Sequence, residues 1–391
     1  MEKNKVIFIS HDASRTGAPF VLLHLLQWLT INSTIEFIIL FKDPSGDLLP
    51  DFNKIGRTYA YWEIYETSYS LKARIKRKIK KAIQYFIAPT ISKNEIVQFN
   101  PNIIYANTVV SCDVAYEIQK IFSNKPKIVC HIHELEIAIN KYFGKKKFNQ
   151  IKHKIDFYIA VSNAVKENLI VNHKIATNKI FLVNAFINAI LNKSLPKASN
   201  IKICLGLKES DILITGCGTI DWRKSPDLFI QVASYVIKKS TNPSLYFIWI
   251  GGKQKTIEFE HLSYDIEKIG LENRIKIMET VTNPIDYLAN STIFLMTSRE
   301  DPYPLVCLEA ASRAVPILCF ENAGGIPEFV AKDAGVIIPY LDIIGMGDTI
   351  LELINNSNKR EMLGIGAQNK VLANHDVSKA GKEIEAILNT I

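Results

Sequence analysis

Short apolar runs alternate along the whole chain with longer segments of helical periodicity. The runs lack the in-and-out alternation of half-exposed strands, which is typical of strands buried on both faces of a parallel sheet. The predicted strands of the first half are Val6–Ile9, Ile35–Leu40, Ile103–Tyr105, Lys127–Ile132, Phe157–Val161 and Ile180–Val183, and those of the second half are Ile212–Thr215, Leu245–Ile250, Arg274–Met278, Ile293–Met296, Pro316–Phe320 and Val336–Ile338. Because helices connect successive parallel strands, the sequence predicts two open, doubly wound α/β domains.

A polar stretch near the middle of the chain, residues 192–200, separates the two strand series and contains one proline. We therefore predict a first domain of residues 1–195 and a second domain of residues 196–375, each within the usual size of a domain. The last segment, residues 376–391, has a helical pattern and no strand. We expect this helix to return to the first domain.

The composition excludes several classes of protein. Hydrophobic residues make up 48% and charged residues 22% of the chain, as in an ordinary globular protein. The apolar run Val6–Ile9 is too short for a signal peptide, and no stretch approaches the roughly 20 apolar residues of a membrane-spanning helix. None of the six cysteines forms a C-x-x-C pair, which indicates buried thiols in a reducing compartment. We predict a cytoplasmic protein.

The net charge of +8 allows contact with anions. Basic residues concentrate in Lys72–Lys81, where seven of ten residues are Lys or Arg, and an apolar group at residues 83–87 follows. On a helix this pattern suits peripheral contact with the anionic inner face of a cell membrane. A solvated charged helix is the alternative.

The stretch Ser298–Ala310 follows a predicted strand and opens a helix. Pro304 suits the first helical position, where no N–H group is needed. The N–H groups of Leu305, Val306 and Cys307 would then point out of the helix start. Together with the helix dipole they predict an anion site that matches a diphosphate.

Two acidic residues flank this helix start. Glu309 lies four residues after Leu305, on the same helix face, where its carboxylate can accept hydrogen bonds from ribose hydroxyls. Asp301 precedes the helix on the side of an attached sugar; alternatively, Asp301 caps the helix and Glu309 faces solvent. The next loop, Ala323–Glu328, contains a Gly-Gly turn after the following strand. Ligands bind at the carboxyl ends of strands in open α/β sheets, which favours a functional role for both loops.

A third loop, Gly216–Asp227, follows the first strand of the second half. The dipeptide Ser225–Pro226 suits the N-cap and first position of a helix. Arg223 and Lys224 stand just before that helix, where two cations suit phosphate oxygens. A dinucleotide fingerprint would need a third glycine where Asp221 stands, so the loop does not favour NAD binding.

In the first half, Gly17 lies in a small-residue loop that allows backbone contact with a ligand. His131 and His133 share one face of a predicted strand. They could chelate zinc, but no third ligand stands at metal-site spacing, so we predict no metal. Ser162 ends another strand and is a candidate helix N-cap or cleft hydroxyl.

The segments GCGTIDWRKSPD, SREDPYPLVCLEA and GGIPE, in this order within residues 211–339, together resemble the donor domain of the family 4 retaining glycosyltransferases. The acidic E-x7-E signature of that family corresponds here to Asp301-x7-Glu309. The resemblance implies a GT-B fold of two Rossmann-like domains that face a central cleft. It also implies metal-independent transfer of a hexose, with retention, from a UDP- or GDP-type nucleotide sugar to a glycan or lipid-linked acceptor, with no cofactor and no nucleic-acid partner.

The resemblance assigns roles to residues of both domains. It implies that Asp301 contacts the donor sugar at its anomeric centre and that Glu309 holds the nucleotide ribose. The backbone at Leu305 and Val306 would bind the diphosphate. In the same way, Lys224 would neutralise the diphosphate.

Three further residues complete the implied site. Arg223 would assist Lys224, and Gly17 would approach the donor phosphate or the acceptor. His133 would be the cleft histidine near the donor sugar, and His131 matches that position less well.

The sequence departs from the family pattern at two positions. Asp301 is one methylene shorter than the usual Glu, and Thr219 stands where the family often has Arg, so that more of the phosphate charge would depend on Arg223. We predict an enzyme of bacterial cell-surface polysaccharide synthesis. The alternatives are a non-catalytic nucleotide-sugar-binding partner of a glycan-assembly complex, which the shorter acid favours, and a GT-B-like sugar epimerase.

Overall fold

The structure is a computed structural model that describes residues 4–61, 88–197 and 201–391. The chain divides into two compact units. One unit is Met1–Ala185 together with Val377–Ile391, and the other is Phe186–Asp376. The basic segment Lys72–Lys81 lies outside the described residues.

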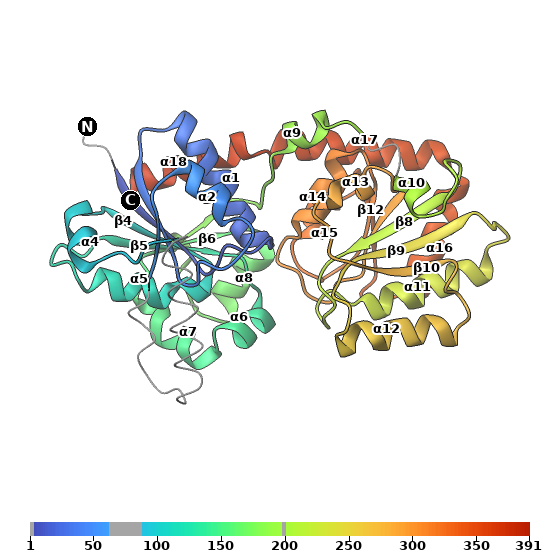
Figure 1. Ribbon diagram of the computed structural model, residues 1–391, viewed down its shortest axis with the longest axis horizontal. Coiled ribbons are helices and arrows are strands. Elements are labelled where there is room, and N and C mark those ends of the chain that lie inside the picture. Colours follow the sequence, from blue (N-terminus) through green and yellow to red (C-terminus); the bar gives the residue numbers. More distant parts are fainter. Residues whose placement is uncertain (1–3, 62–87, 198–200) are drawn as a thin grey trace. The chain divides into compact units, whose positions relative to one another are not determined.

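The first unit is built on a seven-stranded parallel sheet with the strand order β3-β2-β1-β4-β5-β6-β7 (Figure 1). The strands are β1 (Lys5–Ser10), β2 (Glu36–Phe41), β3 (Thr58–Ala60), β4 (Ile103–Asn107), β5 (Lys127–Ile132), β6 (Phe157–Ala160) and β7 (Ile180–Leu182). The order reverses between β1 and β4, which is the point where open α/β sheets bind ligands.

Helices cover the two faces of this sheet (Figure 1). They are α1 (Gly17–Asn32), α2 (Leu49–Ile55), α4 (Lys93–Phe99), α5 (Cys112–Gln119), α6 (Glu136–Tyr142), α7 (Lys145–Ile151), α8 (Asn163–Val171) and the C-terminal α18 (Val377–Thr390). Helix α18 packs against α1, and Gly381 allows this because a Cβ there would lie 2.5 Å from the Trp28 ring. The C-terminal helix is therefore part of the first unit.

The second unit holds a six-stranded parallel sheet with the order β10-β9-β8-β11-β12-β13. The strands are β8 (Ile212–Cys217), β9 (Leu245–Gly252), β10 (Ile275–Glu279), β11 (Ile293–Met296), β12 (Ile317–Phe320) and β13 (Gly335–Ile338). Here the order reverses between β8 and β11. The loops that follow these two strands carry the motifs singled out in the sequence.

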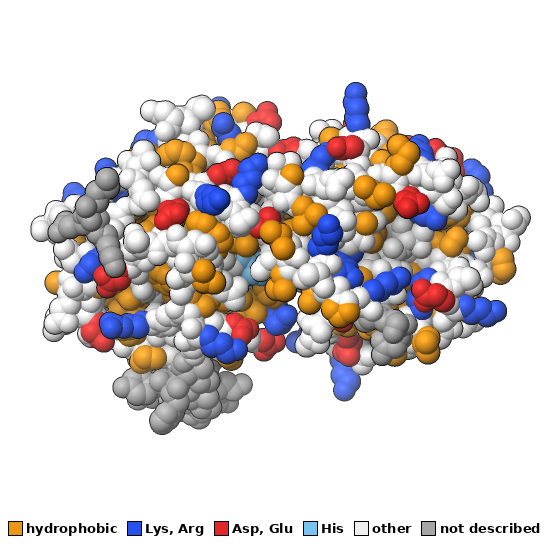
Figure 2. Space-filling model, turned by 90° about the horizontal axis from the view of Figure 1, so that it is seen from above, with side chains coloured by type: hydrophobic (Ala, Val, Ile, Leu, Met, Phe, Trp, Pro, Cys, Tyr) orange, Lys and Arg blue, Asp and Glu red, His pale blue; other side chains and the backbone are white. Residues whose placement is uncertain are grey.

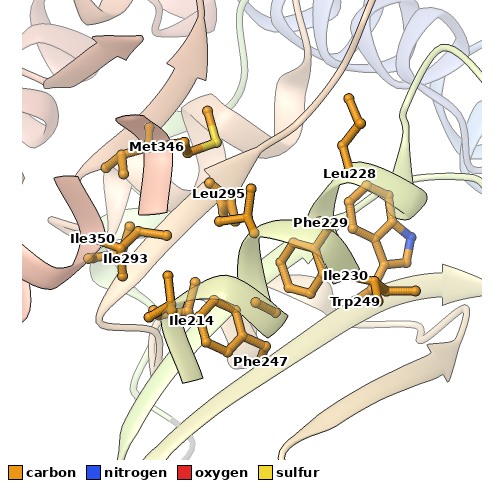
Figure 3. Packing of buried hydrophobic residues seen from close by; sticks show 14 of the residues in the cluster. Ile214, Leu228, Phe229, Ile230, Phe247, Trp249, Ile293, Leu295, Met346 and Ile350 are labelled. Carbon is orange, nitrogen blue, oxygen red and sulfur yellow. The ribbon is translucent and has the colours of Figure 1, made fainter. Parts of the chain in front are cut away.

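The helices of the second unit enclose its sheet from both sides (Figure 1). They are α9 (Ala189–Ser194), α10 (Ile201–Cys204), α11 (Pro226–Lys239), α12 (Ile257–Lys268), α13 (Pro284–Leu288), α14 (Leu305–Ser312), α15 (Ile326–Val330), α16 (Ile343–Asn355) and α17 (Ser357–Asn374). Figure 3 shows part of the core, in which Phe229 packs edge-on against Phe247 and Trp249 at centroid distances of 5.8 and 5.4 Å. This core supports the carboxyl end of β8.

The predicted fold class is confirmed, because each unit is a doubly wound parallel sheet of the Rossmann-like type. Every predicted strand is present, and the short strand β3, which the sequence analysis missed, has only three residues. Two helix starts differ from the prediction. Pro304 stands one residue before α14, and Ser225 has φ 57° and makes no side-chain cap, because its hydroxyl donates to the Trp222 carbonyl.

The division between the units falls after Ala185, before the position at residue 195 that the polar stretch suggested. The reason is that the residues directly after Ala185 already bind to the second unit. The Ile187 N–H donates to the His375 carbonyl at 3.0 Å, and the Arg313 guanidinium donates to the Asn192 carbonyl at 2.7 Å.

No helix among the described residues is long and apolar enough to cross a bilayer. Figure 2 shows that, on the face it draws, Lys and Arg side chains are interspersed with acidic and hydrophobic ones.

Candidate active site

An ion pair joins the loops that follow β8 and β11 in the second unit. The Lys224 ammonium donates to a carboxylate oxygen of Asp301, whose side chain is only 5% exposed. Arg223, beside Lys224, pairs with Asp221 at 3.9 Å. Because a buried carboxylate without a partner is costly, Lys224 and Asp301 hold each other in place. The structure thus brings together two residues that the sequence analysis assigned to one site.

Backbone hydrogen bonds hold three loops together around this pair. The Arg299 N–H donates to the Arg223 carbonyl at 2.7 Å, which connects the β8 and β11 loops. The Asp301 N–H donates to the Ala323 carbonyl at 2.7 Å, and the Gly325 N–H donates back to the Asp301 carbonyl at 3.2 Å. The Gly-Gly loop after β12 therefore supports the backbone of Asp301 from the other side.

Arg299 is a structural residue of this site that the sequence analysis missed. Its guanidinium binds Asp227 through two hydrogen bonds of 3.0 and 2.8 Å and donates to the Ser225 hydroxyl at 3.0 Å. The same guanidinium lies 5.6 Å from the centroid of the Trp222 ring. A planar guanidinium suits such bidentate pairing and stacking. The available signal was a pair of opposite charges in two loops that follow neighbouring parallel strands.

Two glycines allow the β8 loop to approach its neighbours closely. Gly251 has φ +122°, and a Cβ there would lie 2.4 Å from the Gly218 carbonyl oxygen. That oxygen accepts a hydrogen bond of 2.9 Å from the Trp249 indole. Gly218 itself has φ +157°, and a Cβ there would lie 3.1 Å from the Lys224 side chain. The small loop therefore leaves room for the stem of Lys224.

The start of α14 presents backbone donors next to Asp301. Among the residues that the structure describes, the N–H groups of Leu305 and Val306 have no acceptor. The Cys307 N–H, which the sequence analysis counted as free, donates to the Pro304 carbonyl at 3.1 Å. Two N–H groups and the helix dipole remain for an anion.

Glu309 is partly buried. Its negative charge acts on Cys217, the last residue of β8. Burial and the Glu309 carboxylate raise the pKa of the Cys217 thiol to about 12, whereas the Lys224 ammonium acts in the opposite direction. Burial and then the Asp301 carboxylate raise the pKa of Cys307 well above its usual value. The charges of these acids and of Lys224 therefore act on the same small region.

The first unit gathers a second set of predicted residues at the β1–β4 switch point. Asn107, the last residue of β4, donates through its side-chain amide to the Ala18 carbonyl at 2.9 Å. Its side-chain oxygen lies 3.0 Å from Nε2 of His133. Since that oxygen is an acceptor, His133 donates from Nε2. Asn107 therefore connects His133 to the start of α1, where Gly17 is exposed.

His131 and His133 lie against each other with a centroid distance of 4.2 Å. Burial lowers the pKa of His131 to about 3, and Nδ1 of this ring lies 2.7 Å from the Tyr105 hydroxyl. Burial, and then the neighbouring His131 and His11, hold the pKa of His133 well below its usual range. His131 and His133 are therefore neutral at pH 7.

Two further points of the sequence analysis concern Ser162 and metal binding. The Ser162 hydroxyl accepts a hydrogen bond of 3.1 Å from the Val165 N–H and is the N-cap of α8, one of the two predicted roles. Among the described residues, no group of three His, Cys, Asp or Glu side chains is arranged to hold a metal ion.

Comparison with known proteins identifies relatives that share this organisation. Residues 199–370 match the family model described as "Glycosyl transferases group 1". The capsular polysaccharide biosynthesis glycosyltransferase CapH of Staphylococcus aureus is 25% identical over 312 residues, which are 78% of each chain. CapM of the same organism is 22% identical over 235 residues, and this match spans 59% of the chain and 61% of CapM. These matches support the identification of this chain as a glycosyltransferase.

Solved structures share this fold. Anabaena HepE in complex with UDP-glucose has a TM-score of 0.78 at 17% identity, with 99% of this chain and 100% of that chain covered. A mutant of Staphylococcus aureus TarM, solved with UDP among its ligands, has a TM-score of 0.72 at 14% identity, with 99% and 100% covered. The two Rossmann-like units thus match GT-B glycosyltransferase structures.

Proposed function

We propose that this protein is a family 4 retaining glycosyltransferase that moves a hexose from a UDP-type sugar to a glycan or lipid-linked acceptor. The observation that carries the proposal is the convergence of Lys224, Asp301 and the unpaired N–H groups at the start of α14 on one switch point. Cations and helix N-termini bind diphosphates, and carboxylates bind sugar hydroxyls. The capsular relatives support a role in bacterial cell-surface polysaccharide synthesis.

The proposed mechanism depends on stabilising the departing diphosphate. Lys224, Arg223 and the N–H groups of Leu305 and Val306 supply positive charge and hydrogen-bond donors at the place where negative charge develops. In the ligand-free protein Asp301 keeps the Lys224 ammonium oriented. When the donor binds, the Lys224 ammonium is proposed to pair with the diphosphate, and the Asp301 carboxylate is proposed to accept hydrogen bonds from the donor-sugar hydroxyls. The acceptor hydroxyl then attacks the anomeric carbon from the face that the diphosphate leaves and gives its proton to a departing phosphate oxygen, so the anomeric configuration is retained.

Glu309 is proposed to bind the ribose. It stands on α14 one turn beyond the free N–H groups, and its negative charge acts on Cys217 at the end of β8. Both observations support a carboxylate that faces the nucleotide rather than bulk solvent. A carboxylate can accept hydrogen bonds from both ribose hydroxyls.

The first unit is proposed to contribute Gly17 and His133. A neutral His133 that donates from Nε2 to Asn107 keeps Nδ1 as an acceptor, which suits a hydroxyl of the donor sugar. Gly17 lies at the N-terminus of α1, where the exposed backbone suits a phosphate or acceptor oxygen.

Calorimetric titration with UDP and GDP tests the donor class. We expect UDP to bind more tightly than GDP, and binding of neither nucleotide would contradict the proposal. With a UDP-sugar and a panel of lipid-linked and oligosaccharide acceptors, NMR of the product's anomeric proton tests retention. Chelation by EDTA is expected to leave the rate unchanged, since Lys224 and Arg223 are proposed to carry the charge.

The same measurements separate the alternatives. Donor binding without turnover on a broad acceptor panel would favour a non-catalytic nucleotide-sugar-binding partner. Conversion of the donor sugar in the absence of any acceptor would indicate an epimerase. NMR of the donor alone with the protein detects that conversion.

We also propose peripheral contact with anionic membranes through Lys72–Lys81, which lies outside the described residues. Cosedimentation with vesicles that contain phosphatidylglycerol is expected to fall when the basic residues of this segment are replaced by Glu. Unchanged cosedimentation would contradict this proposal.

A further inference from the structure

The loop before α14, residues 301–304, has to hold Asp301 and the first N–H groups of the helix in register. Two of its four residues, Pro302 and Pro304, have no N–H group and cannot donate a backbone hydrogen bond. The residue between them, Tyr303, is buried with 5% exposure although it stands in a loop at the ligand-binding edge of the sheet. Its buried side chain is therefore an anchor of this loop, in addition to the backbone hydrogen bonds of Asp301.

Tyr303 binds a histidine from a distant part of the unit. Its hydroxyl lies 3.3 Å from Nε2 of His375, and the two ring centroids lie 5.4 Å apart with an angle of 35° between the ring planes. His375 packs edge-on against Phe329 of α15 at 5.2 Å. The anchor thus joins the loop before α14 to the helix that follows the Gly-Gly loop.

The backbone of His375 is fixed on both sides. Its N–H donates to the Val371 carbonyl at 2.9 Å and ends α17. Its carbonyl accepts from the Ile187 N–H at 3.0 Å. One residue later, the Asp376 carboxylate accepts from the Ile190 N–H at 3.2 Å, and after Asp376 the chain passes to the first unit. Tyr303 therefore binds a residue whose backbone is hydrogen-bonded on both sides at the end of the second unit.

We propose that Tyr303 and His375 are a positioning pair that sets the geometry of the donor loop, and that the hydrogen bond between them is needed for full nucleotide affinity. The inference rests on the proposed function, because it assigns the loop to a nucleotide diphosphate. Neither side chain is proposed to touch the substrate. They act through Asp301, Leu305 and Val306, because the position of Tyr303 sets the position of the backbone on either side of it.

Two variants test the pair, Tyr303→Phe, which removes only the hydroxyl, and His375→Phe, which replaces the imidazole by a larger ring. Each keeps an aromatic ring and removes one partner of the hydrogen bond. UDP is the probe, and calorimetry gives its Kd. Each variant is expected to bind UDP roughly 3- to 10-fold more weakly, the value of one hydrogen bond. The double variant is expected to lose no more than either single variant, because the pair acts as a unit.

Hydrogen exchange in the ligand-free protein provides a readout that does not depend on UDP. The hydrogen-bonded amides of Asp301 and Cys307 are expected to exchange faster in both variants, while those of α11 stay unchanged. Tyr235→Phe is the matched control, because it removes a tyrosine hydroxyl that binds Asp348 at 2.7 Å on α16 of the same unit. This control is expected to leave both UDP affinity and the exchange of the Asp301 and Cys307 amides unchanged.

The outcomes separate this inference from the proposed function. Faster exchange in the variants, in a protein that does not bind UDP, would support the anchor and contradict the proposed donor. Equal UDP affinity and equal exchange in wild type and variants would overturn the inference. Additive losses in the double variant would also overturn it, since independent packing effects add.

Discussion

At the scale of single residues, the pairing of Lys224 with the buried Asp301 changes how Lys224 can be tested. A substitution that removes only the lysine leaves a carboxylate that is 5% exposed without its partner. Breaking such a pair is destabilising, because the remaining charge stays desolvated. Loss of activity in that variant would therefore mix a chemical effect with a structural one.

We predict that Lys224→Ala lowers the free energy of unfolding by about 2 kcal/mol, less than for a fully buried pair because Lys224 is 18% exposed. Lys224→Ala/Asp301→Asn is expected to recover most of this stability but not the transfer rate, which should fall by roughly 100- to 1000-fold. Urea denaturation and transfer assays measure the two quantities. A double variant with a wild-type rate would remove Lys224 and Asp301 from the mechanism.

The lowered pKa of the buried His131 predicts that the stability of the protein depends on pH. Its folded pKa of about 3 lies below the ordinary value of 6.5, so between these pH values the unfolded chain binds a proton that the native state does not. Stability is expected to fall as the pH decreases from 6.5 toward 3, by about 1.4 kcal/mol per pH unit from this residue.

His131→Asn is the variant that tests this dependence, since its side chain can still bind the Tyr105 hydroxyl. Chemical denaturation at pH 7, 6 and 5 should show a smaller slope in the variant. Part of the slope is expected to remain, because burial lowers the pKa of His133 in the same direction. Identical slopes would show that His131 does not titrate as described.

At the scale of structural elements, the candidate site depends on how closely the loop after β8 approaches the end of β9. The Gly218 carbonyl is enclosed by the Trp249 indole and by the backbone of Gly251. Any side chain at Gly251 would push the β8 loop, and Lys224 with it, away from the sheet edge. The loop position is thus a property of two neighbouring strand ends.

We predict that Gly251→Ala weakens UDP binding by about tenfold and lowers stability by roughly 1–3 kcal/mol, because its Cβ would lie 2.4 Å from the Gly218 oxygen. Gly206→Ala is the control, since Gly206 also has a positive φ, +76°, but no atom lies within 4 Å of its added Cβ. The control should show the backbone strain without the loss of affinity. Calorimetry and thermal denaturation distinguish the two effects.

At the scale of the whole molecule, the chain forms two units with separate cores, and the C-terminal helix belongs to the unit that contains the N-terminus. A ligand that binds one unit stabilises that unit by mass action. The two units should therefore respond differently to ligands and to substitutions.

We predict that UDP at about 100 times its Kd slows hydrogen exchange in the core of the second unit, with a stabilisation of about 2.7 kcal/mol. Gly381→Val should instead destabilise the first unit, because a Cβ at this position would lie 2.5 Å from the Trp28 ring. Lys382→Val, at the exposed next position of α18, is the control. Equal effects of Gly381→Val on both units would show that they unfold as one.

The sequence predicted the two sheets because a buried parallel strand leaves a local signature. Runs such as Ile293–Met296 are apolar at every position, and this pattern needs no knowledge of distant residues. Strand β3 escaped detection because Thr58–Ala60 is too short to give such a pattern. The start of α14 was predicted to within one residue, since Pro304 and the residues after it are also a local signal.

The sequence by itself therefore determined the fold class, the positions of the strands and the loops that carry the chemistry. Only the tertiary structure decided which side chains from those loops meet. Lys224 and Asp301 are 77 residues apart, and Tyr303 and His375 are 72 apart. Such pairs depend on which strand ends lie side by side and on how helices pack over them. Local periodicity carries no information about that arrangement. It shows which face of a helix or strand is buried, but not which other element covers that face.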